Sequence, residues 1–166
     1  MVWLWTLSAM QRNWKTPLFA LVCCLGAGCS VPTEVYVIPH SFIGWVVVVV
    51  DNPKCTAADH VGKKTIIYIQ DDGFSCTSTV LTNRTVYREY RSGSGEGAQL
   101  PVGIPSKGGL IWSETHVSEA RRDGALLLKF IEFFVGPEEL SKTPGTHADP
   151  LQRAVTHGII PESAIK

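Results

Sequence analysis

Histidine and carboxylate side chains that could hold a metal ion or move a proton form two close pairs in this sequence. Asp59 and His60 are adjacent, and Glu114 and His116 are two positions apart. Residues spaced by two share one face of a strand, a geometry that a metal site or a proton relay can use. Zinc normally takes three or four ligands, and the spacing supplies no third one. These four residues are therefore weak metal candidates, with polar surface side chains as the alternative, and we predict neither a catalytic residue nor a cofactor.

Glycine-rich segments imitate motifs for nucleophiles and nucleotides but lack the pattern around them. The stretch "SGSGEG" at 92–97 has the residue types of a serine-hydrolase elbow without its spacing or its helix. The stretch "GKKT" at 62–65 lacks the earlier glycine of a phosphate-binding loop. Both segments are interpreted as loops.

The overall charge gives no electrostatic reason to expect a polyanionic partner. The 166 residues contain 15 basic and 15 acidic side chains, and hydrophobic residues make up 45% of the chain. Because Arg12 and Lys15 belong to the N-terminal segment, the rest of the chain is slightly acidic. We expect no nucleic-acid partner and enough apolar residues for one domain with a core.

The N-terminal segment has the three-part pattern of a secretory signal. Arg12 and Lys15 precede an apolar run from Pro17 to Gly28 that ends in small residues. The pattern begins better at Met10, because a start at Met1 places apolar residues ahead of the charges. We predict a signal peptide over 1–28 with either start.

The stretch "LGAGC" at 25–29 resembles the end of a bacterial lipoprotein signal, in which small residues precede a lipidated cysteine. Leu25 lies four positions before Cys29, whereas the usual pattern places leucine three before. We predict a lipid anchor at Cys29 that holds the protein in the outer membrane, facing the periplasm. The alternative is ordinary signal cleavage and a secreted soluble protein.

Two cysteines remain after the signal and the anchor, Cys55 and Cys76. In an oxidising compartment this number favours one disulfide. Such a bridge would close a loop of about 20 residues and stabilise the fold by roughly 3 kcal/mol. Two separate buried thiols are the alternative, because spacing alone does not show that their Cβ atoms meet.

The run "GWVVVVV" at 44–50 is too short to span a bilayer, which needs about 20 apolar residues in a helix. Valine is β-branched and favours strands, so the run predicts a central strand that is covered on both faces. Trp45, Val47 and Val49 would then point to one face, and the intervening valines to the other. Further strands are predicted near 34–39, 64–70, 75–81, 84–90, 109–114 and 125–135.

These strands, separated by turn residues and without a crossover helix, predict a mostly β fold, an antiparallel β-sandwich of about seven strands. Residues 125–135 also fit a helix, but the aromatic tail before Gly136 favours a strand. We expect a tether over 29–33, the sandwich over 34–140, and a linker and tail over 141–166. The tail includes a short helix with Asp149 as its N-cap, Pro150 at its first position and Gly158 as its stop.

The segments "YVIPHSFIGWVVVVVDNP", "IIYIQDDGFSCTST" and "FFVGPEEL" together resemble the secreted bacterial family known as domain of unknown function 6843. The resemblance covers about residues 34–140 and implies secretion and the domain boundaries. It implies no activity and transfers no catalytic residue. Cys55 and Cys76 do not belong to the shared pattern.

Two functions fit the sequence. The first is a non-enzymatic binding or scaffolding domain, anchored to the membrane, that contacts another envelope protein through loops or a sheet edge. The second is an envelope hydrolase or metal-assisted enzyme whose histidines and carboxylates are brought together by folding. Placement of at least three of them in one pocket would favour the enzyme.

Overall fold

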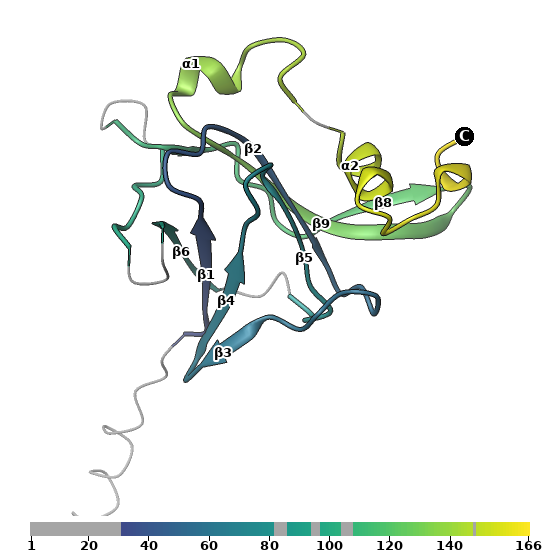
Figure 1. Cartoon of the computed structure of the whole chain (residues 1–166), viewed down its shortest axis with the longest axis horizontal. Helices are drawn as coiled ribbons and strands as arrows, with labels where there is room; N and C mark the ends of the chain where they lie inside the picture. The colour runs from purple at the N-terminus through teal and green to yellow at the C-terminus, as the bar shows by residue number, and fades with distance from the viewer. Residues whose placement is uncertain (1–30, 82–85, 94–96, 104–107, 148) are drawn as a thin grey trace, which may run out of the picture. The chain divides into compact units, whose positions relative to one another are not determined.

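The chain folds mainly into β-strands that form two sheets, followed by short helices (Figure 1). The computed structural model describes residues 31–81, 86–93, 97–103, 108–147 and 149–166, so the predicted signal peptide, Met10 and Cys29 lie outside the described residues. The strands are β1 (Thr33–Ile38), β2 (Gly44–Val50), β3 (Asp59–Val61), β4 (Lys64–Tyr68), β5 (Phe74–Cys76), β6 (Tyr87–Ser92), β7 (Ile111–Trp112), β8 (Ser118–Arg122) and β9 (Ala125–Val135). The helices are α1 (Glu138–Ser141), α2 (Pro150–Thr156) and a 3-10 helix (Glu162–Ala164).

Sheet A has the strand order β3-β4-β1-β6, and sheet B has the order β5-β2-β9-β7, with β8 paired to β9. The predicted mostly β fold in two packed sheets is confirmed, with nine strands among the described residues. The predicted antiparallel pairing holds for β3–β4, β2–β9, β7–β9 and β8–β9, but other pairs make both sheets mixed. Strand β1 runs parallel to β4 and β6, and β2 runs parallel to β5.

The parallel pairs arise from how the chain alternates between the sheets. Parallel neighbours need a crossover connection, which is usually a helix. Here the connection from β1 to β4 passes through β2 in sheet B, and the connection from β4 to β6 passes through β5. The crossover connections therefore contain a strand of the opposite sheet in place of a helix. The prediction of antiparallel pairing rested on the absence of a crossover helix.

Strand β2 is central in sheet B, as predicted, between β5 and β9. Its alternate valines point to opposite faces. Val46, Val48 and Val50 join the core between the two sheets, and Val47 and Val49 join a second buried cluster. Strand β9 confirms the strand interpretation of 125–135 and pairs antiparallel with β2.

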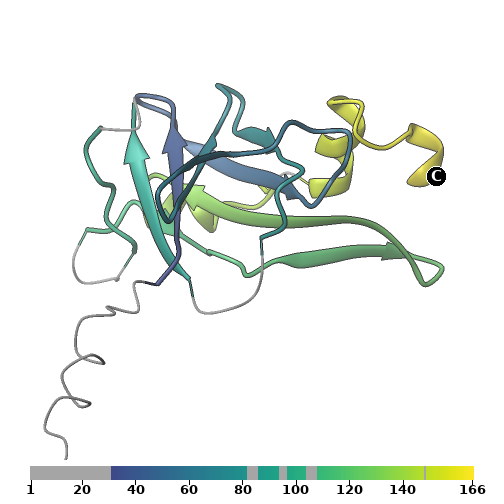
Figure 2. The ribbon, with the colours of Figure 1, turned by 90° about the horizontal axis from the view of Figure 1, so that it is seen from below.

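The second cluster lies between the outer face of sheet B and the C-terminal segment (residues 149–166). Ala154 of α2 and Ile160 are buried there against Val47, Val49 and Leu128. Figure 2 shows the β8–β9 hairpin extending beside α2. The described residues Val31–Lys166 thus form one compact unit with three layers, sheet A, sheet B and the C-terminal segment.

Helix α2 begins and ends where its sequence predicts. The Asp149 side chain accepts a hydrogen bond from the Leu151 amide at 2.9 Å, and Pro150 occupies the first turn. Gly158, just after the helix, has a φ of 69°, which glycine adopts without strain. Within the described part of the chain, no helix is long and apolar enough to cross a membrane.

Candidate functional site

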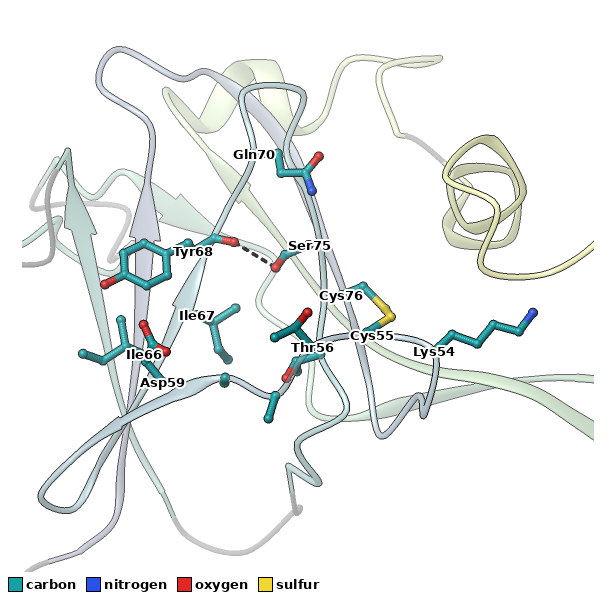
Figure 3. Close-up of a pocket in the computed structure, with 13 residues that line it drawn as sticks. Lys54, Cys55, Thr56, Asp59, Ile66, Ile67, Tyr68, Gln70, Ser75 and Cys76 are labelled. Atoms are coloured by element: carbon teal, nitrogen blue, oxygen red, sulfur yellow. Dashed lines mark hydrogen bonds between the residues drawn. A yellow bond between two sulfur atoms is a disulfide. The ribbon is translucent and has the colours of Figure 1, made fainter.

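A cleft opens between β4 of sheet A and β5 of sheet B, with a volume of about 500 Å³ (Figure 3). Both sheets end close to it, since β5 is the last strand of sheet B and β3, next to β4, is the last strand of sheet A. The cleft is lined by Lys54, Cys55, Thr56, Ala57, Ala58, Asp59, Ile66, Ile67, Tyr68, Gln70, Ser75, Cys76 and Thr77. Three separate segments of the chain therefore build it.

The inner surface of the cleft is set by the register of β5. Ser75 lies opposite Val48, whose side chain points toward sheet A, so Ser75 points the same way. Its hydroxyl donates a hydrogen bond to the Tyr68 carbonyl at 2.8 Å and joins the two sheets (Figure 3). Buried Thr77 follows on the same face. Hydroxyl groups thus occupy the position that apolar residues hold elsewhere between the sheets.

The loop 51–58 forms one wall of the cleft and is held by backbone bonds. The Cys55 amide donates to the Asn52 carbonyl at 3.0 Å, and the Ser78 amide donates to the Thr56 carbonyl at 3.2 Å. Cys55 and Cys76 lie at disulfide distance, with their Cα atoms 5.7 Å apart. The two cysteines that we predicted to pair are thus close enough for a disulfide, which would link the loop 51–58 to β5.

The polar groups of the cleft are suited to hydrogen bonding. Figure 3 shows Gln70 above Ser75 and Thr56 below it, and both residues are exposed. Lys54 points away from the cleft, and its ammonium group donates to the Ile159 carbonyl at 2.9 Å. Among the described lining residues there is no histidine that could act as a base for Ser75. The arrangement can recognise a polar or extended ligand through hydroxyl, amide and backbone groups.

The predicted pair Asp59 and His60 is separated by the fold. The two residues lie on strand β3, where adjacent side chains point to opposite faces. Asp59 lines the cleft, whereas the His60 ring contacts the Thr65 hydroxyl at 3.3 Å. The pair therefore does not converge on one point.

The predicted pair Glu114 and His116 lies in the loop between β7 and β8, so the expectation that it shares a strand face is wrong. The strand ends at Trp112, and Ser113 has a φ of 52°, which turns the chain. The Glu114 carboxylate is bound by Arg88, while His116 is exposed. Within the described ranges no three histidine, cysteine or carboxylate residues are grouped to hold a metal.

The arginine that binds Glu114 belongs to a buried ionic network that the sequence did not indicate. Arg88 of β6 donates to Glu34 of β1 at 3.0 Å and to the Thr115 carbonyl at 2.8 Å. Tyr36 also donates to Glu34, at 2.9 Å. The side chains of Arg88 and Glu34 are only 8% and 5% exposed. This network ties the β7–β8 loop to the inner face of sheet A.

Burial changes the acid–base properties of this network. Burial and the Glu34 carboxylate raise the pKa of Tyr36. Burial alone would lower the pKa of Arg88, but its interactions with Tyr36 and the two carboxylates raise it above the ordinary value. Tyr36 and Arg88 therefore keep their protons, which suits a structural role better than proton transfer.

The residues missed by the sequence analysis left only a faint signal. The small hydroxyl residues of "SCTSTV" interrupt the apolar alternation of a core strand, and the cleft is where Ser75 and Thr77 lie. Two charged residues gave a similar signal. Glu34 lies at the start of an apolar strand, and Arg88 is on the same strand face as buried Tyr90, so both charges lie on an inner face.

The fold and site define a β-sandwich with a helical third layer and a polar cleft between its sheet edges. Neither the family models nor the curated proteins compared with the chain gave a match, so the resemblance to domain of unknown function 6843 stays a prediction. A crystal structure described as "Putative Lipoprotein from Bacillus anthracis" is similar, with a TM-score of 0.55 and 20% sequence identity. The similarity covers 78% of this chain and 95% of that chain. At this identity the likeness concerns the fold.

Proposed function

We propose that this chain is a non-enzymatic, lipid-anchored envelope protein that binds another envelope protein through the cleft between β4 and β5. The observation that carries the binding role is the cleft itself. Its walls are two neighbouring sheet edges, and its lining combines hydroxyl, amide and backbone groups with the apolar side chains of Ile66 and Ile67. Exposed sheet edges and loops on a rigid scaffold are common sites of peptide recognition.

The proposed anchor is a lipid on Cys29, after removal of the signal peptide 1–28. The small residues before Cys29 support it, and so does the description of the similar crystal structure as a lipoprotein. Strand β1 begins at Thr33, so only a short tether over 29–33 would separate the lipid from the sandwich. The cleft would then face a partner close to the membrane, in the periplasm if the membrane is the outer one.

The binding role can be tested by photo-crosslinking in the native envelope. A photoreactive residue at Thr56 or Gln70 probes the cleft, and one at Leu126, which is 43% exposed on the β8–β9 hairpin, is the matched control. We expect the same protein to be crosslinked from both cleft positions and not from Leu126. Equal crosslinking from Leu126, or no crosslinked protein from either cleft position, would contradict the proposal.

The anchor is tested separately by intact mass of the membrane-extracted protein. A diacyl or triacyl adduct on Cys29 is expected, and Cys29→Ser should release the protein from the membrane fraction. An unmodified soluble product that starts near this position would show ordinary cleavage instead. Sedimentation of the separated membranes then distinguishes an outer-membrane location from an inner one.

A further inference from the structure

A second cavity, at the end of the sandwich where β1 turns into β2, has a volume of about 450 Å³. It is separate from the cleft between β4 and β5, since the two share no lining residue. The β1–β2 turn forms one side of it, and the ends of β6 and β9 with two loop leucines form the rest. A cavity of this size falls within the usual range of small-molecule sites.

The interior of this cavity is apolar. Buried Ile38 and Val135 contribute to its floor, and half-buried Phe42 and Leu100 contribute to its walls. Two apolar side chains at its lining remain in contact with solvent, Ile43 with 59% and Leu110 with 36% exposure. The cavity thus offers a hydrocarbon surface that opens to the outside.

Three polar residues, His40, Ser41 and Ser92, also line the cavity. The Nδ1 atom of His40 lies 3.4 Å from the Ser92 hydroxyl, and Ser41 follows His40 in the turn. Imidazole and hydroxyl groups can each donate a hydrogen bond to a carboxylate. An apolar interior with polar groups on one side matches a ligand that has a hydrocarbon chain and a small polar head.

Backbone geometry preforms the cavity. The Phe42 amide donates to the Pro39 carbonyl at 3.2 Å, which closes the β1–β2 turn. Gly136 has a φ of 132°, and a Cβ atom there would come within 2.9 Å of the Ile43 side chain. A glycine at position 136 therefore lets Ile43 lie close to the end of β9.

We propose that this cavity binds a single-chain carboxylic amphiphile, with the hydrocarbon chain among Ile38, Phe42 and Val135 and the carboxylate at His40 and Ser92. The proposal is independent of the partner of the β4–β5 cleft. It names a free fatty acid as the ligand, because the polar groups at the lining are few and suit a single small head group.

The test is calorimetric titration of octanoate, decanoate and dodecanoate, below their micelle concentrations, into the chain from residue 29 with Cys29→Ser. This protein contains the whole compact unit Val31–Lys166 and lacks the lipid anchor proposed at Cys29. We expect one saturable site whose affinity rises about fourfold per added methylene. The methyl ester of decanoic acid should bind at least several-fold more weakly, because it lacks the charge. A lysophospholipid that competes better than dodecanoate would overturn the choice of a free fatty acid.

Variants locate the site. Ile43→Asp places a charge at the apolar opening and should weaken decanoate binding at least tenfold. Val61→Asp is the matched control, because Val61 is similarly exposed at 62% and does not line the cavity. Leu110→Asp provides a second opening variant if Ile43→Asp does not fold, as judged by thermal melting. Absence of saturable binding, affinity independent of chain length, or full affinity in both opening variants would overturn the proposal.

Discussion

The two faces of sheet B are covered in different ways. On the inner face, Val46, Val48 and Val50 pack against sheet A, so this contact joins the two sheets of the sandwich. On the outer face, Val47 and Val49 pack against the C-terminal segment, which contains α2 and the 3-10 helix. Both sets of valines are at most 1% exposed, so the degree of burial does not distinguish them.

The difference lies in what surrounds the contact. Around the outer layer, the His157 ring stacks on Phe74 at 3.9 Å and contacts Asp72 at 2.8 Å. The His147 ring meets Trp45 edge-on at 4.6 Å, although its side chain is 49% exposed. These are side-chain contacts at the border of the layer, whereas backbone ladders build both sheets of the inner layer. We therefore expect the C-terminal segment to detach from sheet B while the sandwich stays folded. The two sheets, in contrast, cannot separate without unfolding of the sandwich.

The largest effect is expected for Val48→Asp on the inner face. Val48 is fully buried between β5 and β9, so the new carboxylate would be unpaired in the core. A cost above about 4 kcal/mol is expected, enough to abolish the folded domain. Soluble yield and circular dichroism measure it, with Val80→Asp at a 60% exposed valine as the control. A folded Val48→Asp protein would mean that this face is not core.

The buried ionic network of the inner layer should give the next largest effect. Arg88→Ala leaves Glu34 buried without its cation, which costs about 3–5 kcal/mol. The exposed pair Arg121 and Glu119 is the control, and Arg121→Ala should cost less than about 1 kcal/mol. Denaturant unfolding compares the two variants. Equal losses of stability would refute a special role for the buried pair.

The cysteine pair at the edge of the outer layer comes third. Cys76 lies opposite Val49 and packs with the second cluster, and 21 positions separate it from Cys55. Replacing both cysteines by serine should lower the free energy of unfolding by about 3 kcal/mol through loss of the cross-link. Thiol labelling of the unreduced protein checks the bond directly, because two labelled thiols would mean that no bridge forms.

The smallest effect is expected for Ala154→Leu in the outer layer. Ala154 is fully buried, so three added carbons overpack the contact at a cost of about 1–3 kcal/mol. Hydrogen exchange should speed up in residues 150–160 while the amides of β2 stay protected. Gln152→Leu, at an exposed position of the same helix, is the control. Equal loss of protection in β2 would show that the two layers open together.

Much of the scaffold was predictable from local sequence. The uninterrupted valines of β2 predicted a strand covered twice, and Asp149, Pro150 and Gly158 predicted the limits of α2. These features depend on neighbours a few positions away. The parallel pairing was not predictable in this way, because it depends on a crossover through the other sheet.

The candidate site was less predictable for a similar reason. Thr56, Tyr68 and Ser75 come from three segments, and each is an ordinary residue in its own segment. Arg88 and Glu34 are 54 positions apart, so their contact is a property of β1 and β6 side by side. Only the cysteine pair could be predicted from residue types, because Cys55 and Cys76 are the two cysteines left after the signal peptide and Cys29.

The position of β2 in the chain also has a consequence for synthesis. Its antiparallel partner β9 begins at Ala125, and the helix that covers its outer face begins at Pro150, so β2 leaves the ribosome roughly 75 to 100 residues before these two elements, although its parallel partner β5 begins already at Phe74. At the usual rates of translation, the outer face of β2 and its edge toward β9 would remain uncovered for about 4–20 s. Such a segment is prone to intermolecular β-pairing. A chaperone that holds the nascent chain should therefore raise the yield of folded protein.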